Sequence, residues 1–238
     1  MLTKRLKDDN WALHQIAERQ ESPGSLIKGT MPKDGYLAML AQQHLINRAL
    51  DSAMRDAIKS DPRIGELVLE EQFFTPYTQA DLAFFGIDED SIEPAIGTQR
   101  YIDHIESHKD QALHLLGLHY VRLGASNGNR FVAKVVRKSY ALEEDGTRAL
   151  DPFGESQRAK WMDFKNALDA MPFNQGEQDA VFDGTRAAYV GAINQNLEEA
   201  MSAEQLLEKH GKTLDKKAFD EGHSVHVASP YQGEKQHS

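Results

Sequence analysis

The 238-residue chain contains no cysteine. Disulfides, thiolate metal ligands and cysteine nucleophiles are therefore excluded, and a cytoplasmic location is expected. Long apolar runs are absent as well, since no stretch reaches the roughly 18 residues of a membrane span. No apolar segment follows the basic first residues in the manner of a signal peptide. The sequence therefore predicts no membrane span and a cytoplasmic protein.

Positively charged residues are also outnumbered by negatively charged ones. The chain has 27 Lys and Arg residues against 37 Asp and Glu residues, which gives a formal net charge of -10. Binding to a polyanion requires clustered Lys and Arg that neutralise phosphates. Nucleic acid is therefore not an expected partner.

Apolar residues recur at helical spacing through most of the chain, and few segments alternate strictly. This pattern predicts an all-α fold. A first helix is expected over residues 3–20, ended by the turn signal Ser22-Pro23-Gly24, and a second from Pro32 to about Ser60. Thr78 is expected to cap a short helix. The remaining helices are predicted at 79–85, 95–107, 109–140, 155–170 and 175–209, with the helix 109–140 broken at two glycines.

The apolar pattern ends near Gly211. Residues 211–238 are too polar to bury much surface, which predicts a mobile C-terminal tail. One domain over residues 1–210 is therefore expected, followed by the tail 211–238.

His14 is the first candidate for a functional residue. Lys7 precedes it by seven residues and Glu18 follows it by four, so a single helix would stack the three along one stripe. A lone His on a helix is more often a surface or core residue than a metal ligand. Here the apolar neighbours favour a neutral imidazole, and Glu18 could orient the ring through its other nitrogen. The pattern indicates a metal-binding imidazole.

Two glycines, Gly124 and Gly128, interrupt an otherwise good helix in Gly124-Ala125-Ser126-Asn127-Gly128. They could mark a simple loop, but helical periodicity on both sides favours one bent helix. Because glycine has no Cβ, such a helix can bring its backbone close to a planar ligand. Together with His14, these glycines suggest a flat ligand held between two helices.

These segments resemble the biliverdin-producing haem oxygenases. Lys7, His14 and the pair Ala17-Glu18 are similar to the proximal helix of that family. The resemblance extends over most of residues 2–200. Further segments that carry it are Ala80–Gly86, Gln99–Tyr101, Tyr120–Gly128 and Phe164–Pro172.

The resemblance implies a multi-helix bundle that holds haem between the first helix and a kinked distal helix. Haem would be both substrate and cofactor, opened to biliverdin, CO and Fe(II) with O2 and electrons from a reductase or ferredoxin. His14 would be the iron ligand, with Glu18 beside it. The other residues that the resemblance brings to the haem are Lys7 and Lys165 for the propionates, and Tyr120, Gly124, Asn127 and Gly128 on the distal side.

The chain departs from the family pattern at Ala125, where many members carry an aspartate that anchors distal water. Some bacterial members also lack this aspartate. The nearby polar residues that could hold water instead are Ser126, Asn127, Asn129 and Arg130.

Three other interpretations remain open. A haem carrier or sensor of the same fold would bind haem without turnover. A di-iron oxidase could use Asp103, His104, Glu106 and His108, although an exposed helix face explains these residues as well. Finally, Lys4, Arg5 and Lys7 could form a positive patch for the electron donor, or simply a solvated terminus.

Overall fold

A computed structural model describes residues 1–221, and every regular element in that range is helical. The all-α prediction is confirmed. The α-helices are α1 (Leu2–Asp8), α2 (Trp11–Glu18), α3 (Glu21–Ile27), α4 (Lys33–Ser60), α5 (Pro62–Leu67), α6 (Thr75–Phe84), α7 (Ile96–Ser107), α8 (Ala112–Tyr140), α9 (Gln157–Ala170), α10 (Gln175–Asn194), α11 (Ala203–His210) and α12 (Lys216–Asp220). Short 3-10 turns are η1 (Glu70–Gln72), η2 (Glu89–Ser91), η3 (Gly154–Ser156) and η4 (Gly211–Thr213).

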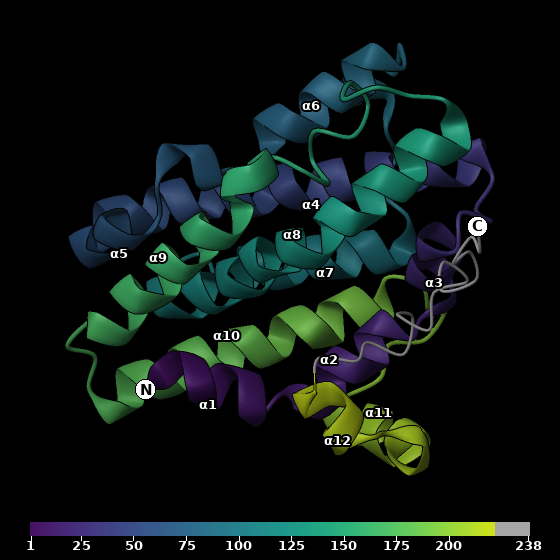
Figure 1. Ribbon diagram of the computed structural model, residues 1–238. Helices are drawn as coiled ribbons and strands as arrows, with labels where there is room; N and C mark the ends of the chain where they lie inside the picture. The colour runs from purple at the N-terminus through teal and green to yellow at the C-terminus, as the bar shows by residue number, and fades with distance from the viewer. Residues whose placement is uncertain (222–238) are drawn as a thin grey trace, which may run out of the picture.

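Helix α8 is the centre of the bundle. It packs against α4 on one side and α10 on the other, with α9 and α3 also in contact (Figure 1). Its fully buried leucines join the largest apolar cluster, which includes Met54 of α4, Ile105 of α7 and Val181 of α10. Burying such side chains stabilises the fold by about 1.5–3 kcal/mol each relative to exposure.

Helices α8 and α10 approach each other so closely that their backbones touch. A Cβ on Gly117 would lie 2.2 Å from the carbonyl oxygen of Val181, and a Cβ on Gly184 would lie 2.0 Å from that of His114. Any residue other than glycine would force the two helices apart at these positions. The glycines therefore fix where α10 lies on α8.

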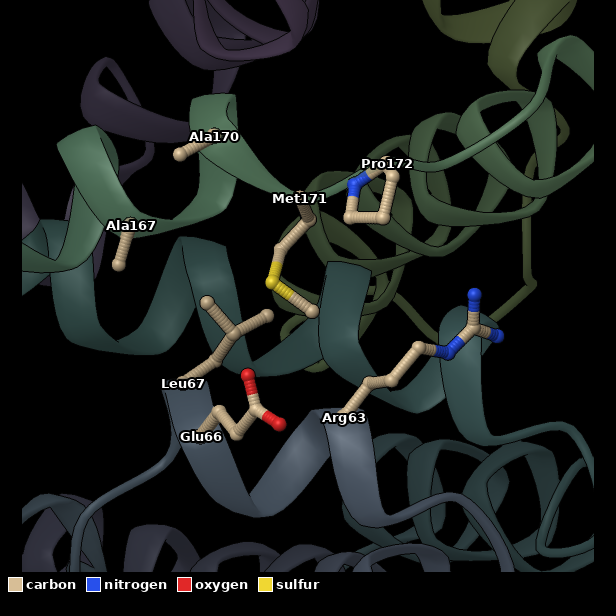
Figure 2. Close-up of a pocket in the computed structure, with 7 residues that line it drawn as sticks. All are labelled: Arg63, Glu66, Leu67, Ala167, Ala170, Met171 and Pro172. Carbon is tan, nitrogen blue, oxygen red and sulfur yellow. The ribbon is translucent and has the colours of Figure 1, made fainter.

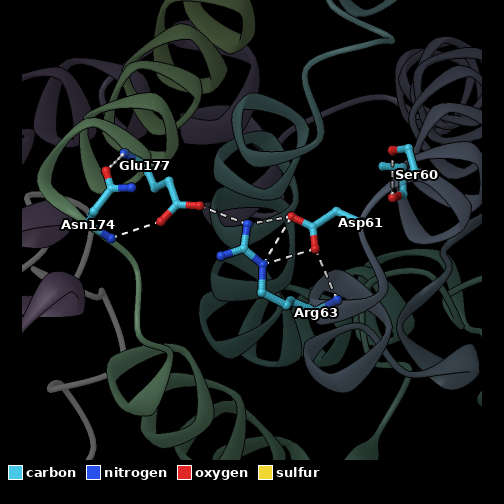
Figure 3. Close-up of polar contacts among 6 residues, drawn as sticks. Ser60, Asp61, Arg63, Asn174 and Glu177 are labelled. Atoms are coloured by element: carbon cyan, nitrogen blue, oxygen red, sulfur yellow. Dashed lines mark hydrogen bonds and ion pairs between the residues drawn. The ribbon is translucent and has the colours of Figure 1, made fainter.

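A polar contact ties α5 to the start of α10 (Figure 3). The guanidinium of Arg63 bonds Asp61 at 2.7 Å and Glu177 at 2.8 Å. Glu177 also accepts from the backbone N–H of Asn174 at 2.8 Å, and the Asn174 side chain caps α10 in return. This reciprocal cap satisfies two backbone donors that a bare helix terminus leaves unpaired.

The predicted first helix over residues 3–20 is wrong, because the chain forms two helices there. The break falls at Asp9 and Asn10, and the buried Asn10 side chain donates to the carbonyl of Leu6 at 3.1 Å. Asparagine competes in this way with the backbone ladder of a helix. Lys7 and His14 consequently lie on different helices.

The turn predicted at Ser22-Pro23-Gly24 is also wrong, because α3 runs through it. Pro23 occupies the first turn of α3, where a backbone N–H has no partner within the helix, so its missing donor costs nothing. The long helix expected from Pro32 to Ser60 is confirmed as α4, with Pro32 at the N-cap.

Three other boundaries differ from prediction. Helix α6 begins at Thr75 rather than Gln79, because Asp51 accepts from both the N–H and the hydroxyl of Thr75. Helix α8 continues through both glycines, so the expected break does not occur. Helix α10 ends at Asn194, whose side chain pairs with the backbone of Met201 and closes a turn before α11.

The C-terminal prediction is wrong for residues 211–221, which fold against α2 as η4 and α12. The buried Gln15 side chain donates to the carbonyl of Asp215 at 2.7 Å and accepts from its N–H at 2.8 Å. Phe219 is buried, at 9% exposure, beside Trp11. The rest of the predicted tail, residues 222–238, lies outside the described residues.

We predict that Gln15→Met releases α12 from α2 while the bundle stays folded. The variant loses two hydrogen bonds, a cost of about 1–3 kcal/mol. Amide hydrogen exchange at 215–219 should therefore be about 5–150-fold faster. The matched control is Gln20→Met, because the Gln20 side chain, just after α2, donates to the carbonyl of Ile16 of α2. Equal exchange in both variants would contradict this account of how α12 docks.

Candidate functional site

His14 lies on α2 with its side chain 38% exposed, so one part of the ring is accessible. Its Nε2 lies 3.3 Å from Oε1 of Glu18, one turn further along the helix. The ring stacks on Tyr189 of α10, with centroids 5.3 Å apart, and meets Phe219 of α12 edge-on at 5.3 Å. These three groups thus fix the orientation of the imidazole. An N–H donated to Glu18 leaves the lone pair of the other ring nitrogen for a metal.

Lys7, on α1, also lies near the His14 ring. Its Nζ lies 5.3 Å from the centre of the Phe219 ring, the ring that also touches His14. The predicted stripe on a single helix does not exist, but tertiary packing brings the cation and the imidazole to one aromatic side chain.

Helix α10 provides the wall behind His14. Burial raises the pKa of the Tyr189 phenol, and the neighbouring Tyr120 and Glu18 act in the same direction. Tyr120, on α8, is itself buried and lies 5.1 Å from the Trp161 ring of α9. Aromatic contacts therefore join α2 to α10 through His14 and Tyr189, and α8 to α9 through Tyr120 and Trp161.

The two distal glycines have different surroundings. At Gly124, an added Cβ would lie 3.1 Å from Cη2 of Trp161, so an indole covers this glycine. At Gly128, an added Cβ would meet nothing within 4 Å, and the residue is exposed. Only Gly128 of the pair presents a backbone that is open to a ligand.

Helix α2, which carries His14, is connected to α8 through α3. Helix α3 follows α2 directly and packs on α8 through Leu26, which contacts Val132 and Val136. These valines come one to two turns after Gly128. The helix that carries His14 and the open segment of α8 are thereby joined through a single short element.

Two of the polar residues expected to hold distal water are engaged elsewhere. The Ser126 hydroxyl is buried, donates to the carbonyl of Leu123 and accepts from Gln157 at 2.9 Å. Arg130 faces Asp151 at 3.8 Å. Asn127 donates to the carbonyl of Gly124 at 3.0 Å, which leaves its side-chain oxygen as an acceptor.

Lys165, the second cation predicted for a propionate, lies on α9. Its Nζ is 5.5 Å from the centre of the Trp161 ring, the indole that covers Gly124. The residue is half-buried, so its ammonium stays close to this wall.

The positive patch predicted at the N-terminus is largely neutralised. Lys4 pairs with Asp8, and Arg5 bonds Asp179 of α10 at 2.6 Å. Of the three cations, Lys7 is the one that faces the candidate site. The first residues therefore anchor α1 to the bundle more than they offer charge to a partner.

The di-iron interpretation lacks its carboxylates. Within residues 1–221, the cluster of potential metal ligands is composed of His104, His108 and His114, without Asp103 or Glu106. Asp103 instead accepts from the Gln99 side chain at 2.8 Å. A di-iron centre needs bridging carboxylates, so these residues do not form one.

A cavity lies elsewhere in the molecule. It has a volume of about 470 Å³ and lies between α5 and the end of α9, lined by residues such as Arg63, Leu67 and Met171 (Figure 2). Its lining includes none of the predicted site residues.

Among the described residues, no helix combines the length and the apolar character that a membrane span requires.

Comparison with known proteins identifies the family. The family model described as "Heme oxygenase" matches residues 1–199. The chain belongs to the haem oxygenase family, a family of oxidoreductases. A "Heme oxygenase" of Pyropia yezoensis is 25% identical over 179 residues, covering 73% of this chain and 75% of the relative.

Solved structures show the same fold. Heme oxygenase-1 from Synechocystis, solved in complex with heme, superposes with a TM-score of 0.74 at 19% identity, covering 89% of this chain and 96% of that one. A heme oxygenase from Leptospira interrogans gives a TM-score of 0.74 at 22% identity, covering 82% and 99%. The expected haem oxygenase-like bundle is confirmed.

Tyr189, Phe219 and Trp161 are the residues that the sequence did not reveal. Each acts through tertiary contact with a residue at least 37 positions away, and none stands in a distinctive motif. Phe219 carried a weak signal, as an isolated aromatic in a polar segment.

We predict opposite effects of Gly128→Ala and Ala125→Gly on the protein without haem. The new methyl group at Gly128 enters open space, and alanine is favoured over glycine by about 0.8–1.0 kcal/mol in a helix. The melting temperature should rise by about 2–4 °C in Gly128→Ala and fall by a similar amount in Ala125→Gly, as followed by circular dichroism.

The larger side chain of Gly128→Phe tests the site itself. If Gly128 contacts the flat ligand, this variant should lose haem affinity while its helical content remains. Unchanged haem affinity in Gly128→Phe would show that the ligand does not lie against this part of α8.

Proposed function

We propose that this protein opens haem to biliverdin, CO and Fe(II), using O2 and electrons from an external reductase or ferredoxin, with His14 as the proximal iron ligand. The observation that carries the proposal is the pair of His14 and Glu18 on α2, within a chain whose residues 1–199 match the family. Bound haem supplies the iron at which O2 is reduced and the porphyrin ring that is opened.

The surroundings of His14 fit an axial ligand. The ring is accessible on one side, and Oε1 of Glu18 lies 3.3 Å from Nε2. A hydrogen bond donated by this nitrogen to the carboxylate increases the basicity of the other ring nitrogen. Stacking on Tyr189 and the edge of Phe219 restrict rotation about the side-chain torsions. A neutral imidazole also donates less electron density to iron than a thiolate does, and the chain has no thiol.

Charge at the rim fits a ligand with carboxylates. Lys7 lies beside Phe219 and Lys165 beside Trp161, so each ammonium sits next to an aromatic wall of the site. Each contributes about 0.2–1 kcal/mol to a partly exposed ion pair with a propionate. Two such contacts change the affinity for haem only slightly. Their larger effect is to favour one orientation of the porphyrin ring over the others.

On the distal side, α8 provides space and a hydrogen-bond acceptor. The open backbone at Gly128 allows close approach of a flat ring, and the Asn127 side-chain oxygen can accept from a water molecule. Exposed Ala125 provides no proton relay. Asn127 is therefore the side chain on this turn that we assign to ordering distal water.

A haem carrier or sensor is the second candidate. It is favoured by Ala125 and by the internal hydrogen bonds of Ser126, which remove two sources of distal polarity. Such a protein would bind haem through His14 in the same way and differ only in turnover.

The decisive experiment adds hemin to the purified protein and follows its visible spectrum with a competent reducing system and O2. We expect one-to-one binding, followed by loss of the Soret band and release of biliverdin. Stable haem under reducing conditions would overturn the oxygenase and leave the carrier or sensor.

The variant His14→Ala tests the ligand. It should keep the helical circular dichroism of wild type but lose the spectrum of histidine-ligated haem, and added imidazole should partly restore it. His210→Ala, which changes a half-buried histidine of α11, is the control. A haem spectrum that is the same in His14→Ala and wild type would end the assignment.

A further inference from the structure

A second cluster of imidazoles lies where α7 ends and α8 begins. His104 and His108 come from α7 and its C-cap, and His114 from the first turn of α8. The Nε2 atoms of His104 and His114 are 3.0 Å apart, and the His108 ring stacks on His114 with centroids 4.2 Å apart. One ring nitrogen from each residue lies within 4.8 Å of the other two.

The tautomer of His108 is fixed by its neighbours. A carbonyl oxygen accepts only, so Nδ1 of His108 donates to the carbonyl of His104 at 2.8 Å. The hydroxyl of Ser107 donates to the same carbonyl at 2.8 Å. Nε2 of His108 therefore carries a lone pair. Metal-binding histidines are commonly oriented by such a bond from the other ring nitrogen to a backbone carbonyl.

The contact between His104 and His114 requires a cation or a proton between two nitrogens. At 3.0 Å, one Nε2 must donate to the other. A zinc ion with Zn–N bonds of about 2.0–2.1 Å in tetrahedral geometry holds its nitrogens about 3.3–3.4 Å apart. Replacing the shared proton by a metal therefore needs a displacement of only a few tenths of an ångström.

The surroundings favour neutral imidazoles. Burial lowers the pKa of His114 to about 4, and burial also lowers the pKa of His104, with His108 acting in the same direction on both. The end of α7 attracts a cation, whereas the start of α8 repels one, so the helix dipoles offset each other. The ring nitrogens of His104, His108 and His114 therefore determine which ion can bind.

We propose that His104, His108 and His114 bind a divalent transition-metal ion of the zinc class, with water in the fourth position. Three neutral imidazoles without a carboxylate suit Zn²⁺ and its neighbours rather than Mg²⁺ or Ca²⁺, which prefer oxygen ligands. The site is separate from His14 in sequence and shares no residue with it.

The bound ion would join α7 to α8 across the turn at 109–111. The carbonyl of His114 lies against Gly184 of α10, so the ion would secure the corner at which α8 and α10 touch. Its effect is stabilisation of the folded bundle, independent of haem.

The test uses the full-length, haem-free protein after treatment with a chelator, with ZnCl2 as the probe. Calorimetric titration should give one Zn²⁺ per chain, and the melting temperature should rise by about 5–10 °C at a free Zn²⁺ concentration about 100 times the dissociation constant. Co²⁺ in place of Zn²⁺ should give the visible bands of a four-coordinate site.

Single substitutions locate the ion. His104→Gln and His108→Gln change partly exposed residues and should weaken Zn²⁺ binding at least about 10–100-fold, the range seen for loss of an outer-shell partner, while the unfolding temperature without metal stays close to that of wild type. His114→Gln should do the same if it folds. His14→Gln is the first control, and its Zn²⁺ affinity should equal that of wild type.

The second control addresses other histidines in the chain. A variant with His223, His226 and His237 changed to Gln should bind Zn²⁺ as wild type does. The proposal is overturned if wild type shows no stoichiometric binding, if His104→Gln and His108→Gln bind normally, or if this control variant abolishes the titration.

Discussion

The backbone contact between α8 and α10 is the constraint on which the rest of the bundle depends. Gly117 and Gly184 let the two helices meet without side chains between them. Because interiors are close-packed, a shift at this crossing would move every element that rests on α10. Among these is α2, which packs on α10 through the cluster of Leu13, Ile16 and Ile193.

The same crossing sets the geometry of both sites. It positions α10, whose Tyr189 is the ring against which His14 stacks. At the other end it holds the backbone of His114 against Gly184, next to the histidine cluster. The proposed haem site at α2 and the proposed metal site at α7 are therefore separate sites in one scaffold.

Much of the fold could be predicted from periodicity because long amphipathic helices carry a local signal. Helices α4, α7 and α9 agree with prediction to within two residues. The errors arose where a single polar side chain decides a boundary, as Asn10 does between α1 and α2. The docking of α12 could not be predicted, since Gln15 and Asp215 are 200 residues apart.

In the candidate site as well, local pairs could be predicted from the sequence and tertiary contacts could not. His14 and Glu18 could be paired from the sequence because residues four apart share a helix face, and the structure places them in contact. Trp161 and Phe219 become neighbours of the site only after the chain folds. For the histidine cluster, the spacing of His104 and His108 was visible, but His114 lies on the next helix.

In the proposed haem complex, Glu18 orients and polarises an iron-bound His14. Resonance Raman spectra of the ferrous haem-loaded protein measure the iron–histidine stretch directly. Because a carboxylate acceptor strengthens the donor power of the opposite nitrogen, Glu18→Gln should shift this band to lower frequency. The absence of such a band in wild type, or an identical band in Glu18→Gln, would contradict the account.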